Sequence, residues 1–270
     1  MKFDLHTHHD RCGHAQGGIE DYIKAAIKAG LSVIGISDHS PYFGRLEDQP
    51  EPRVAMAKSE FDDYVREVLR LKEKYAGQIE VLLGVESDFF EDEVEIYRAA
   101  FAPYPFDYII GSVHKTRGVS IFNRNRWKRL SDEEKLAEKK EYYRLIKGSA
   151  EAGLFQILGH IDAMKGNYPA FSEIRGAEKE IDAVFETIAR HDIALEINTS
   201  GKTKDSGGWY PSDDLLERAL YFGCDVTFGS DAHEPGRVAD EWDLVARRLK
   251  EIGFKRWVFY RGKKKQAVPL

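Results

Sequence analysis

The chain has 270 residues, of which 42% are hydrophobic and 12% aromatic, so it is long enough for one large domain with a full core. Its formal net charge of −6 is spread along the sequence and gives no electrostatic reason to expect nucleic acid or an anionic membrane as a partner. The apolar runs are too short to span a bilayer. With only two cysteines and no room for a signal peptide before the first motif, we expect a cytoplasmic protein.

Short apolar runs alternate with longer amphipathic segments along the chain. The apolar runs are typical of strands covered on both faces, and they span Lys2–Leu5, Val33–Ser37, Glu80–Glu86, Tyr108–Val113, Gln156–Gly159, Ala194–Asn198, Asp225–Gly229 and Trp257–Tyr260. The amphipathic segments predict helices over Ile19–Ala29, Ser59–Tyr75, Asp132–Ala152, Gly176–His191, Ser212–Phe222 and Asp240–Ile252. The alternation predicts an α/β fold with parallel strands and right-handed crossovers. We interpret the basic run Lys263–Lys265 as a solvated terminus.

Histidines and carboxylates, with one asparagine, follow successive predicted strands. They are Asp4-Leu-His6-Thr-His8 with His14 behind it, Ser37-Asp38-His39, Val85-Glu86, Gly111-Ser-Val-His114, Gly159-His160, Asn198, and Gly229-Ser-Asp231-Ala-His233. The carboxyl ends of the strands of a parallel barrel meet at one rim, where the chemistry gathers. Successive strands each end in a polar residue at the same rim. This pattern predicts a barrel rather than a doubly wound open sheet.

Two long irregular segments, Ser40–Lys58 and Lys115–Leu130, each directly follow one of these histidines. We interpret both as active-site loops, because no linker, repeat or low-complexity tract interrupts the pattern. The prediction is a single domain over residues 1–270.

The histidines and carboxylates of these motifs predict clustered metal ions. Imidazole with carboxylate is a ligand set for Zn, Mn and Fe, and both groups are costly to bury without a partner. Residues i and i+2 of a strand point the same way, so His6 and His8 can converge on one ion, as can Asp231 and His233. One such histidine alone would more often be a core imidazole bonded to a carbonyl. His9 lies off this alternation, and we expect it to support the ligands or to lie at the surface.

Other catalytic signatures are missing from the sequence. There is no G-x-S-x-G elbow, Walker loop or G-x-G-x-x-G after a strand, and the Cys/His spacing fits no zinc finger or ribbon. Clustered ions held by histidines and shared carboxylates are suited to making hydroxide at neutral pH and binding an oxyanion.

Together these motifs resemble the PHP superfamily, named after polymerase and histidinol phosphatase. The flanking residues are similar to its histidinol-phosphate phosphatase branch, and they include Cys12-Gly-His14-Ala, Tyr104-Pro-Phe-Asp-Tyr-Ile-Ile-Gly-Ser-Val-His114, Gly153-Leu-Phe-Gln-Ile-Leu-Gly-His160 and Asn198-Thr-Ser-Gly. The resemblance implies a distorted (β/α)7 TIM-like barrel that binds about three divalent ions at its carboxyl-terminal rim.

The resemblance also implies how the ligands divide among the ions. The first ion would be held by His6, His8, Glu86 and Asp231. Glu86 would bridge to a second ion bound by His114 and His160. The third ion would be held by His14, His39 and His233.

The implied reaction is hydrolysis of a phosphate monoester, most specifically of L-histidinol phosphate to L-histidinol and phosphate in histidine biosynthesis. A hydroxide bridging the first two ions would attack phosphorus, with Glu86 and Asp231 as essential carboxylates. The donor of a proton to the leaving alkoxide stays open among Asp231, Asp38 and a metal-bound water.

The chain departs from that branch around the expected substrate pocket. It reads Lys115-Thr-Arg117-Gly118 where an aromatic residue usually follows the histidine, and Lys202-Thr-Lys204 where an arginine is common. Lysine is a point charge and arginine a bidentate fork, so the phosphate contacts would differ. The residues that we expect to contact phosphate are Arg117, Lys202, Lys204 and Asn198. For the rest of the substrate, the two loops are expected to offer Tyr42, Phe43, Glu47, Asp48 and Trp127.

Two alternatives stay open at this point. One is a PHP phosphoesterase for another substrate, such as a nucleotide, a sugar phosphate or phosphotyrosine on a protein. The other is a non-catalytic regulatory barrel like the degenerate PHP domains of some polymerases, although those have typically lost ligands that this chain retains. The sequence does not choose among Zn, Mn and Fe.

Overall fold

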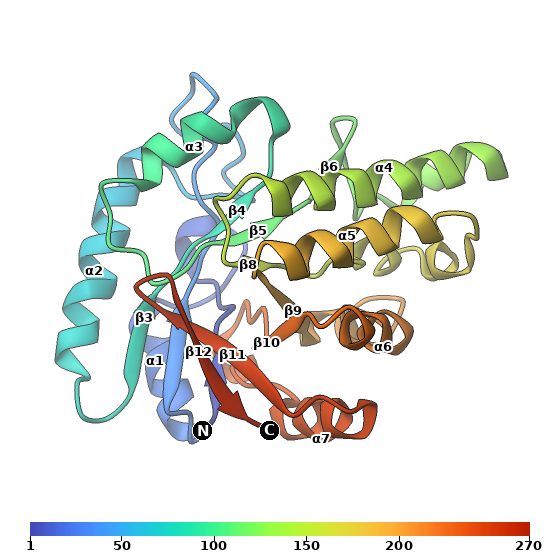
Figure 1. The fold of residues 1–270 in the computed structure, drawn as a ribbon. Helices are drawn as coiled ribbons and strands as arrows, with labels where there is room; N and C mark the ends of the chain where they lie inside the picture. Colours follow the sequence, from blue (N-terminus) through green and yellow to red (C-terminus); the bar gives the residue numbers. More distant parts are fainter.

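In the computed structural model, which describes residues 1–270, parallel strands form the centre and helices surround them (Figure 1). The strands of the centre are β1 (Phe3–Asp4), β2 (Val33–Ile36), β3 (Glu80–Leu83), β4 (Glu86–Asp88), β5 (Ile110–Ser112), β8 (Ile157–Leu158), β9 (Ala194–Asn198) and β10 (Asp225–Gly229). The helices are α1 (Ile19–Lys28), α2 (Phe61–Lys74), α3 (Val94–Phe101), α4 (Asp132–Glu151), α5 (Glu178–Arg190), α6 (Asp213–Tyr221) and α7 (Trp242–Ile252). Each predicted helix is present within a few residues of its expected bounds, whereas the short α3 was not predicted.

The strands form two parallel sheets that meet on both sides. Their orders are β1-β2-β3 and β10-β9-β8-β5-β4, and β3 and β4 are consecutive pieces separated only by Gly84 and Val85. Isolated parallel bridges join Thr7 to Ala232 and His39 to Glu86, just beyond the paired strand ends. The ring of strands is therefore closed through the same residues that carry the motifs, as a distorted barrel requires.

Tyr108 fills the interior of the ring. Its hydroxyl donates a hydrogen bond to the carbonyl of Leu5 at 2.6 Å. A Cβ at Gly35 would lie 1.8 Å from the Tyr108 hydroxyl, and one at Gly84 would lie 2.4 Å from the ring. Glycine at these two positions lets a large side chain pack against the strands. The core is one cluster of 68 buried apolar residues, which supports the proposal of one domain over residues 1–270.

A C-terminal hairpin lies across the amino-terminal ends of the strands, opposite the motif residues. It consists of β11 (Arg256–Arg261) and β12 (Lys264–Pro269), so the predicted strand Trp257–Tyr260 is not part of the ring. Trp257 packs on Phe3 with ring centroids 5.0 Å apart. Lys265 pairs with Asp225 at 3.0 Å, and its basic run turns into β12. The run enters β12 instead of a loose end, but Lys263 and Lys264 are exposed, so its interpretation as solvated agrees with the structure.

The two predicted loops lie on the rim side and contain little regular structure. The segment after His114 forms a small hairpin of β6 (Lys115–Thr116) and β7 (Val119–Ser120). The segment after His39 has no strand before the 3-10 turn at Lys58–Glu60. No helix of the chain combines the length and apolar character needed to cross a membrane.

Candidate active site

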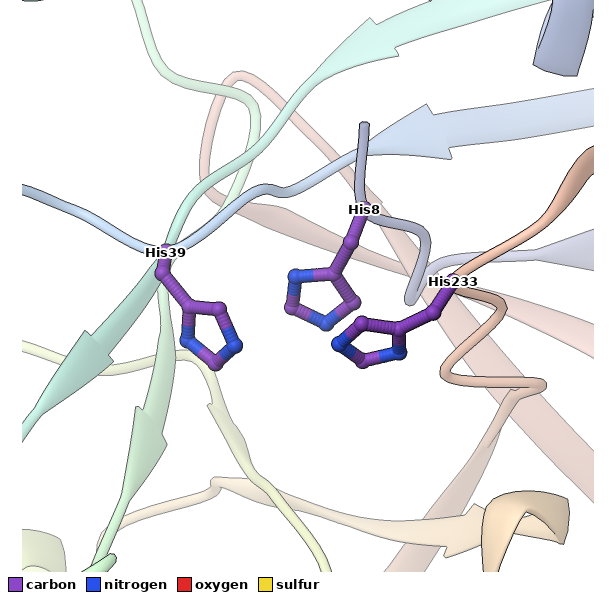
Figure 2. Close-up of side chains that lie close together, drawn as sticks. All are labelled: His8, His39 and His233. Atoms are coloured by element: carbon purple, nitrogen blue, oxygen red, sulfur yellow. The ribbon is translucent and has the colours of Figure 1, made fainter. Parts of the chain in front are cut away.

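The structure brings all of the predicted ligand residues to one rim. Figure 2 shows the imidazole rings of His8, His39 and His233, which arrive from the ends of three different strands. The ring centre of His8 lies 4.3 Å from that of His39 and 4.2 Å from that of His233. The i, i+2 pairs converge as well, with the ring centres of His6 and His8 4.9 Å apart and Nδ1 of His233 3.4 Å from Oδ1 of Asp231.

Glu86 lies at the centre of the cluster and is almost fully buried. Its Oε1 is 3.1 Å from Nε2 of His160 and 3.5 Å from Nε2 of His114. Its Oε2 is 2.8 Å from Nδ1 of His39 and 3.4 Å from Nε2 of His6. One carboxylate thus contacts four imidazoles, two through each of its oxygens.

Asp231 is held by contacts on both of its oxygens. Oδ1 lies 3.0 Å from Nε2 of His8. Oδ2 accepts hydrogen bonds from Oγ of Ser200 at 2.9 Å and from Nδ2 of Asn198 at 3.2 Å. The residue has a left-handed φ of 52°, which is unusual outside glycine and is found where a side chain must be aimed. Its side chain remains 12% exposed, toward the cavity described below.

The imidazoles of His14 and His233 are neutral. The Nε2 atoms of His14 and His233 lie 2.9 Å apart, which is stable only when at least one of the two rings is neutral. Burial, followed by the charges of neighbouring histidines, lowers the pKa of His14 to about 4. Burial and the nearby His8 lower the pKa of His233 to about 3. Both rings therefore keep nitrogen lone pairs free at neutral pH, the form in which histidine binds a metal.

The two shared carboxylates and the histidines His8 and His114 hold opposite charges. Burial alone would lower the pKa of His8 and of His114, but adjacent carboxylates raise each to about 9. For His8 these carboxylates are Asp231 and Asp38. Burial would raise the pKa of Glu86 and Asp231, yet the surrounding histidines hold both well below their usual range. The cluster therefore concentrates negative charge on two shared carboxylates, which favours cations between them.

These donor atoms fit metal ions better than they fit one another. The buried Nε2 atoms of His6 and His8 and Oε2 of Glu86 have no hydrogen bond of proper geometry, although charged atoms lie beside them. Unpaired buried polar atoms are rare in native proteins and mark a missing partner. Sets of three donor atoms within 4.8 Å of one another are formed by His8, His39 and His233, by His6, His8 and Asp231, and by His39, Glu86 and His114. The set of His6, His8 and Asp231 lies within the ligands that the resemblance implies for the first ion, whereas the other two sets combine ligands of different ions.

Three carboxylates that were not predicted as ligands orient the predicted ones, and of these Glu196 and Asp38 are buried and Asp88 is partly buried. Glu196 accepts a hydrogen bond from the backbone N–H of His160 at 3.0 Å, and its other oxygen lies 2.6 Å from Nδ1 of His6. Asp88 lies 2.8 Å from Nδ1 of His114. A charged residue inside an apolar strand, two positions before Asn198, was the signal for Glu196, and the i+2 position after Glu86 was the signal for Asp88.

Asp38, the third of these carboxylates, lies behind the cluster rather than in it. Its Oδ1 is 3.2 Å from Nδ1 of His8, and its Oδ2 is 3.3 Å from Nδ1 of His9. Both aspartate and His9 are buried, and the His9 ring stacks on Tyr64. Because Asp38 is fully buried and does not line the cavity, it is placed to orient His8 rather than to reach a leaving group.

A cavity of about 540 Å³ opens above the cluster. Of the residues expected to contact phosphate, only Lys204 lines it. Arg117 is 61% exposed and pairs with Glu138 at 3.1 Å, whereas Lys202 pairs with Asp240 at 2.8 Å, and Asn198 supports Asp231 from behind. The cations that line the cavity beside Lys204 are Arg53, Lys115 and Arg237, which the sequence did not single out as phosphate contacts.

The loops place one of the expected aromatic residues at the cavity. Tyr42 lines it, but Phe43 packs into an aromatic cluster, with its ring centroid 5.2 Å from that of Phe61. Trp127 is buried and stacks on Tyr168 with ring centroids 4.5 Å apart. Asp48 accepts a hydrogen bond from Ser59 at 2.7 Å, and neither it nor Glu47 lines the cavity. The expectation for these other loop residues was wrong, because loop side chains follow local packing that the strand pattern does not determine.

Known proteins of similar sequence identify the family of this chain. Residues 4–200 match the PHP domain family. The chain belongs to the PHP family. It is 30% identical over 270 residues to a histidinol-phosphatase of Bacillus subtilis, covering 92% of this chain and 99% of that protein. It is also 30% identical over 263 residues to a probable histidinol-phosphatase of Deinococcus radiodurans, covering 97% and 98%.

The fold of this PHP protein matches a solved structure over nearly its whole length. The crystal structure of histidinol phosphate phosphatase from Lactococcus lactis, complexed with zinc, L-histidinol and phosphate, superposes with a TM-score of 0.80. The alignment covers 98% of both chains at 20% sequence identity. The predicted α/β barrel architecture is thereby confirmed.

Proposed function

We propose that this protein is a metal-dependent phosphomonoesterase that hydrolyses L-histidinol phosphate to L-histidinol and phosphate. The observation that carries the proposal is a buried cluster of imidazoles around Glu86 and Asp231 that faces a cavity edged with cations. Its unpaired donor atoms fit divalent ions, and the cations beyond them fit a phosphate ester.

Nine side chains would hold about three divalent ions, a number that leaves coordination positions for water and substrate. They are His6, His8, His14, His39, Glu86, His114, His160, Asp231 and His233. When bound, such ions supply an acidified water as the nucleophile and neutralise charge on the phosphoryl oxygens. Zn, Mn and Fe all suit these ligands.

The protein's own acid–base chemistry centres on Asp231. Of the three candidate carboxylates it is the most exposed to the cavity, since Glu86 is almost fully covered and Asp38 does not reach the cavity at all. Ser200 and Asn198 bind Oδ2, so a proton passed on by Asp231 would be held at Oδ1, beside Nε2 of His8. We assign Glu86 to bridging and Asp38 to the orientation of His8.

Lys204 and Lys115 are the cations that this arrangement favours for the phosphate. Lys204 lies on the loop that follows Ser200, and Lys115 directly follows His114, so both border the cluster as well as the cavity. Lysine contributes charge without the bidentate geometry of arginine. The full-length relatives named histidinol-phosphatase support histidinol phosphate as the ester that fills the remaining space.

A panel of phosphate esters tests the proposal. The purified protein, reconstituted in turn with Zn, Mn and Fe(II), is assayed for phosphate release from histidinol phosphate, a nucleotide, a sugar phosphate, phosphotyrosine and an aryl phosphate. We expect kcat/KM for histidinol phosphate to exceed that for the others by at least about tenfold. Equal rates on all esters would favour a general phosphoesterase, and no hydrolysis of any ester would favour a regulatory metal-binding barrel.

A further inference from the structure

The outer wall of the cavity holds one carboxylate that does not belong to the metal cluster. The acidic residues that line the cavity are Glu86, Asp231 and Glu51, and only Glu51 lies outside the cluster. In the structure its Oε1 forms an ion pair with the ammonium of Lys115. That ammonium also lies 5.3 Å from the centre of the Tyr42 ring. An acidic group beside an aromatic ring therefore faces the cavity from the side of His114.

Glu51 is held in place by the loop that carries His14. The carbonyl of Glu51 accepts hydrogen bonds from the N–H groups of Val54 at 3.0 Å and Ala55 at 3.1 Å, which fix the turn. The next carbonyl, of Pro52, packs against Gly13. A Cβ at Gly13 would lie 1.9 Å from that oxygen, and the left-handed φ of 80° also requires glycine. The position of Glu51 is thus tied to the metal cluster through the residue before His14.

The other side of the ion pair is fixed as well. Arg126 is only 6% exposed and donates hydrogen bonds to the carbonyls of Val119 and Ser120, both at 3.1 Å. The same guanidinium binds Glu138 of α4 at 2.5 Å. The β6–β7 hairpin is therefore anchored to a helix of the barrel, and it presents Lys115 next to His114.

We propose that Glu51 is the specificity-determining residue that binds the ammonium group of the substrate. The inference rests on the proposed function, in which the substrate is an amino alcohol phosphate. The primary ammonium of such a substrate is charged at neutral pH, whereas its imidazole, with an ordinary pKa of about 6.5, is mostly neutral. The substrate ammonium therefore takes the place that the Lys115 ammonium occupies in the structure.

The exposure of the pair makes this exchange feasible. The side chains of Glu51 and Lys115 are 38% and 28% exposed, and an ion pair in contact with water is weakly held. When substrate binds, its ammonium replaces that of Lys115, so the Glu51 carboxylate keeps a cationic partner. Lys115 is then free to bind the phosphate beside His114. A phosphate ester that lacks the ammonium group makes no such exchange. Glu51 therefore discriminates between esters with an ammonium group and esters without one.

Kinetics with two matched esters test this assignment. The metal-loaded wild type and the Glu51→Gln variant are compared on histidinol phosphate and on its des-amino analogue, which keeps the imidazole and the phosphate. Glu47→Gln, in the same loop but outside the cavity, is the control. We expect Glu51→Gln to lower kcat/KM for histidinol phosphate about tenfold or more, through KM. For the des-amino analogue we expect a change of less than about twofold.

The possible outcomes separate this assignment from the proposed function. Equal losses on both esters in Glu51→Gln, or none on either, would overturn the role of Glu51 while leaving the phosphatase activity in place. No hydrolysis of either ester by the metal-loaded wild type would overturn the proposed function itself. Thermal unfolding of the variant, compared with Glu47→Gln, identifies a loss that comes from misfolding.

Discussion

The cluster of histidines and carboxylates at the barrel rim and the loops above it are built in different ways. In the cluster, most side chains come from strand ends, and His6, His8 and His114 are each oriented by a carboxylate, as Glu196 orients His6. In the loops, the cavity is bordered by partly exposed charges such as Lys115 and Glu51, which pair with each other. Under the proposed function, the barrel would position the chemistry and the loops would select the ester.

The largest effect is expected inside the cluster. Glu86→Gln and Asp231→Asn should each lower turnover by several orders of magnitude, because an amide cannot neutralise clustered positive charge. Glu86→Gln should also lower the metal content, since Glu86 contacts four imidazoles. Steady-state kinetics and elemental analysis measure the two effects, with Glu91→Gln on the surface as the control. Near-normal turnover in either cluster variant would refute its role.

The next largest effect is expected at the carboxylates that orient the histidines, such as Glu196. It shows whether metal binding and activity depend on them. Glu196→Gln should reduce metal affinity or activity by about 10- to 100-fold, because Glu196 fixes both His6 and the backbone of His160. Glu217→Gln on the exposed face of α6 should have no effect. If Glu196→Gln binds metal with wild-type affinity and retains full activity, the cluster does not depend on its buried support.

The same division explains what the sequence could predict. His6, His8 and Asp231 are recognisable because strand geometry places them at one rim, and a few residues then suffice to infer the barrel. Glu196 and Asp88 follow the same alternation, but each looks like an isolated acidic residue until its histidine partner is known. Arg117 could not be assigned, because its position depends on a short hairpin and on Glu138 of a distant helix.

A third test uses pH to examine the cluster without substrate. In the metal-free protein the pKa values of His8 and His114 are raised to about 9 from 6.5. A raised pKa stabilises the metal-free fold below pH 6.5, and this stability is lost as pH rises through about 9. Metal must displace these protons, so affinity should rise by up to about tenfold per pH unit for each histidine across that window. Titration calorimetry in buffers of different ionisation enthalpy measures the proton release, and its absence would contradict the assignment.

The smallest effects are expected in the loops. Lys204→Ala should lower kcat/KM about three- to tenfold on every phosphate ester, because Lys204 lines the cavity and makes no ion pair. Arg117→Ala should change it by less than about twofold, since Arg117 is largely exposed and directed at Glu138. From the sequence alone, Arg117 was expected to contact the phosphate shared by all esters, so its loss would have weakened all of them. Steady-state kinetics of both variants on two esters show which of the two residues contacts the phosphate. A larger loss in Arg117→Ala than in Lys204→Ala would mean that the hairpin moves toward the phosphate.

We propose that the rim of this barrel holds several catalytic metal ions. Anomalous diffraction from crystals of the metal-reconstituted protein with phosphate, combined with elemental analysis and an activity assay of the same preparation, tests it most directly. We predict about three ions, within bonding distance of Glu86, Asp231 and the surrounding imidazoles, in a preparation that hydrolyses histidinol phosphate. A fully occupied, active preparation with one ion or none at the rim would contradict the claim.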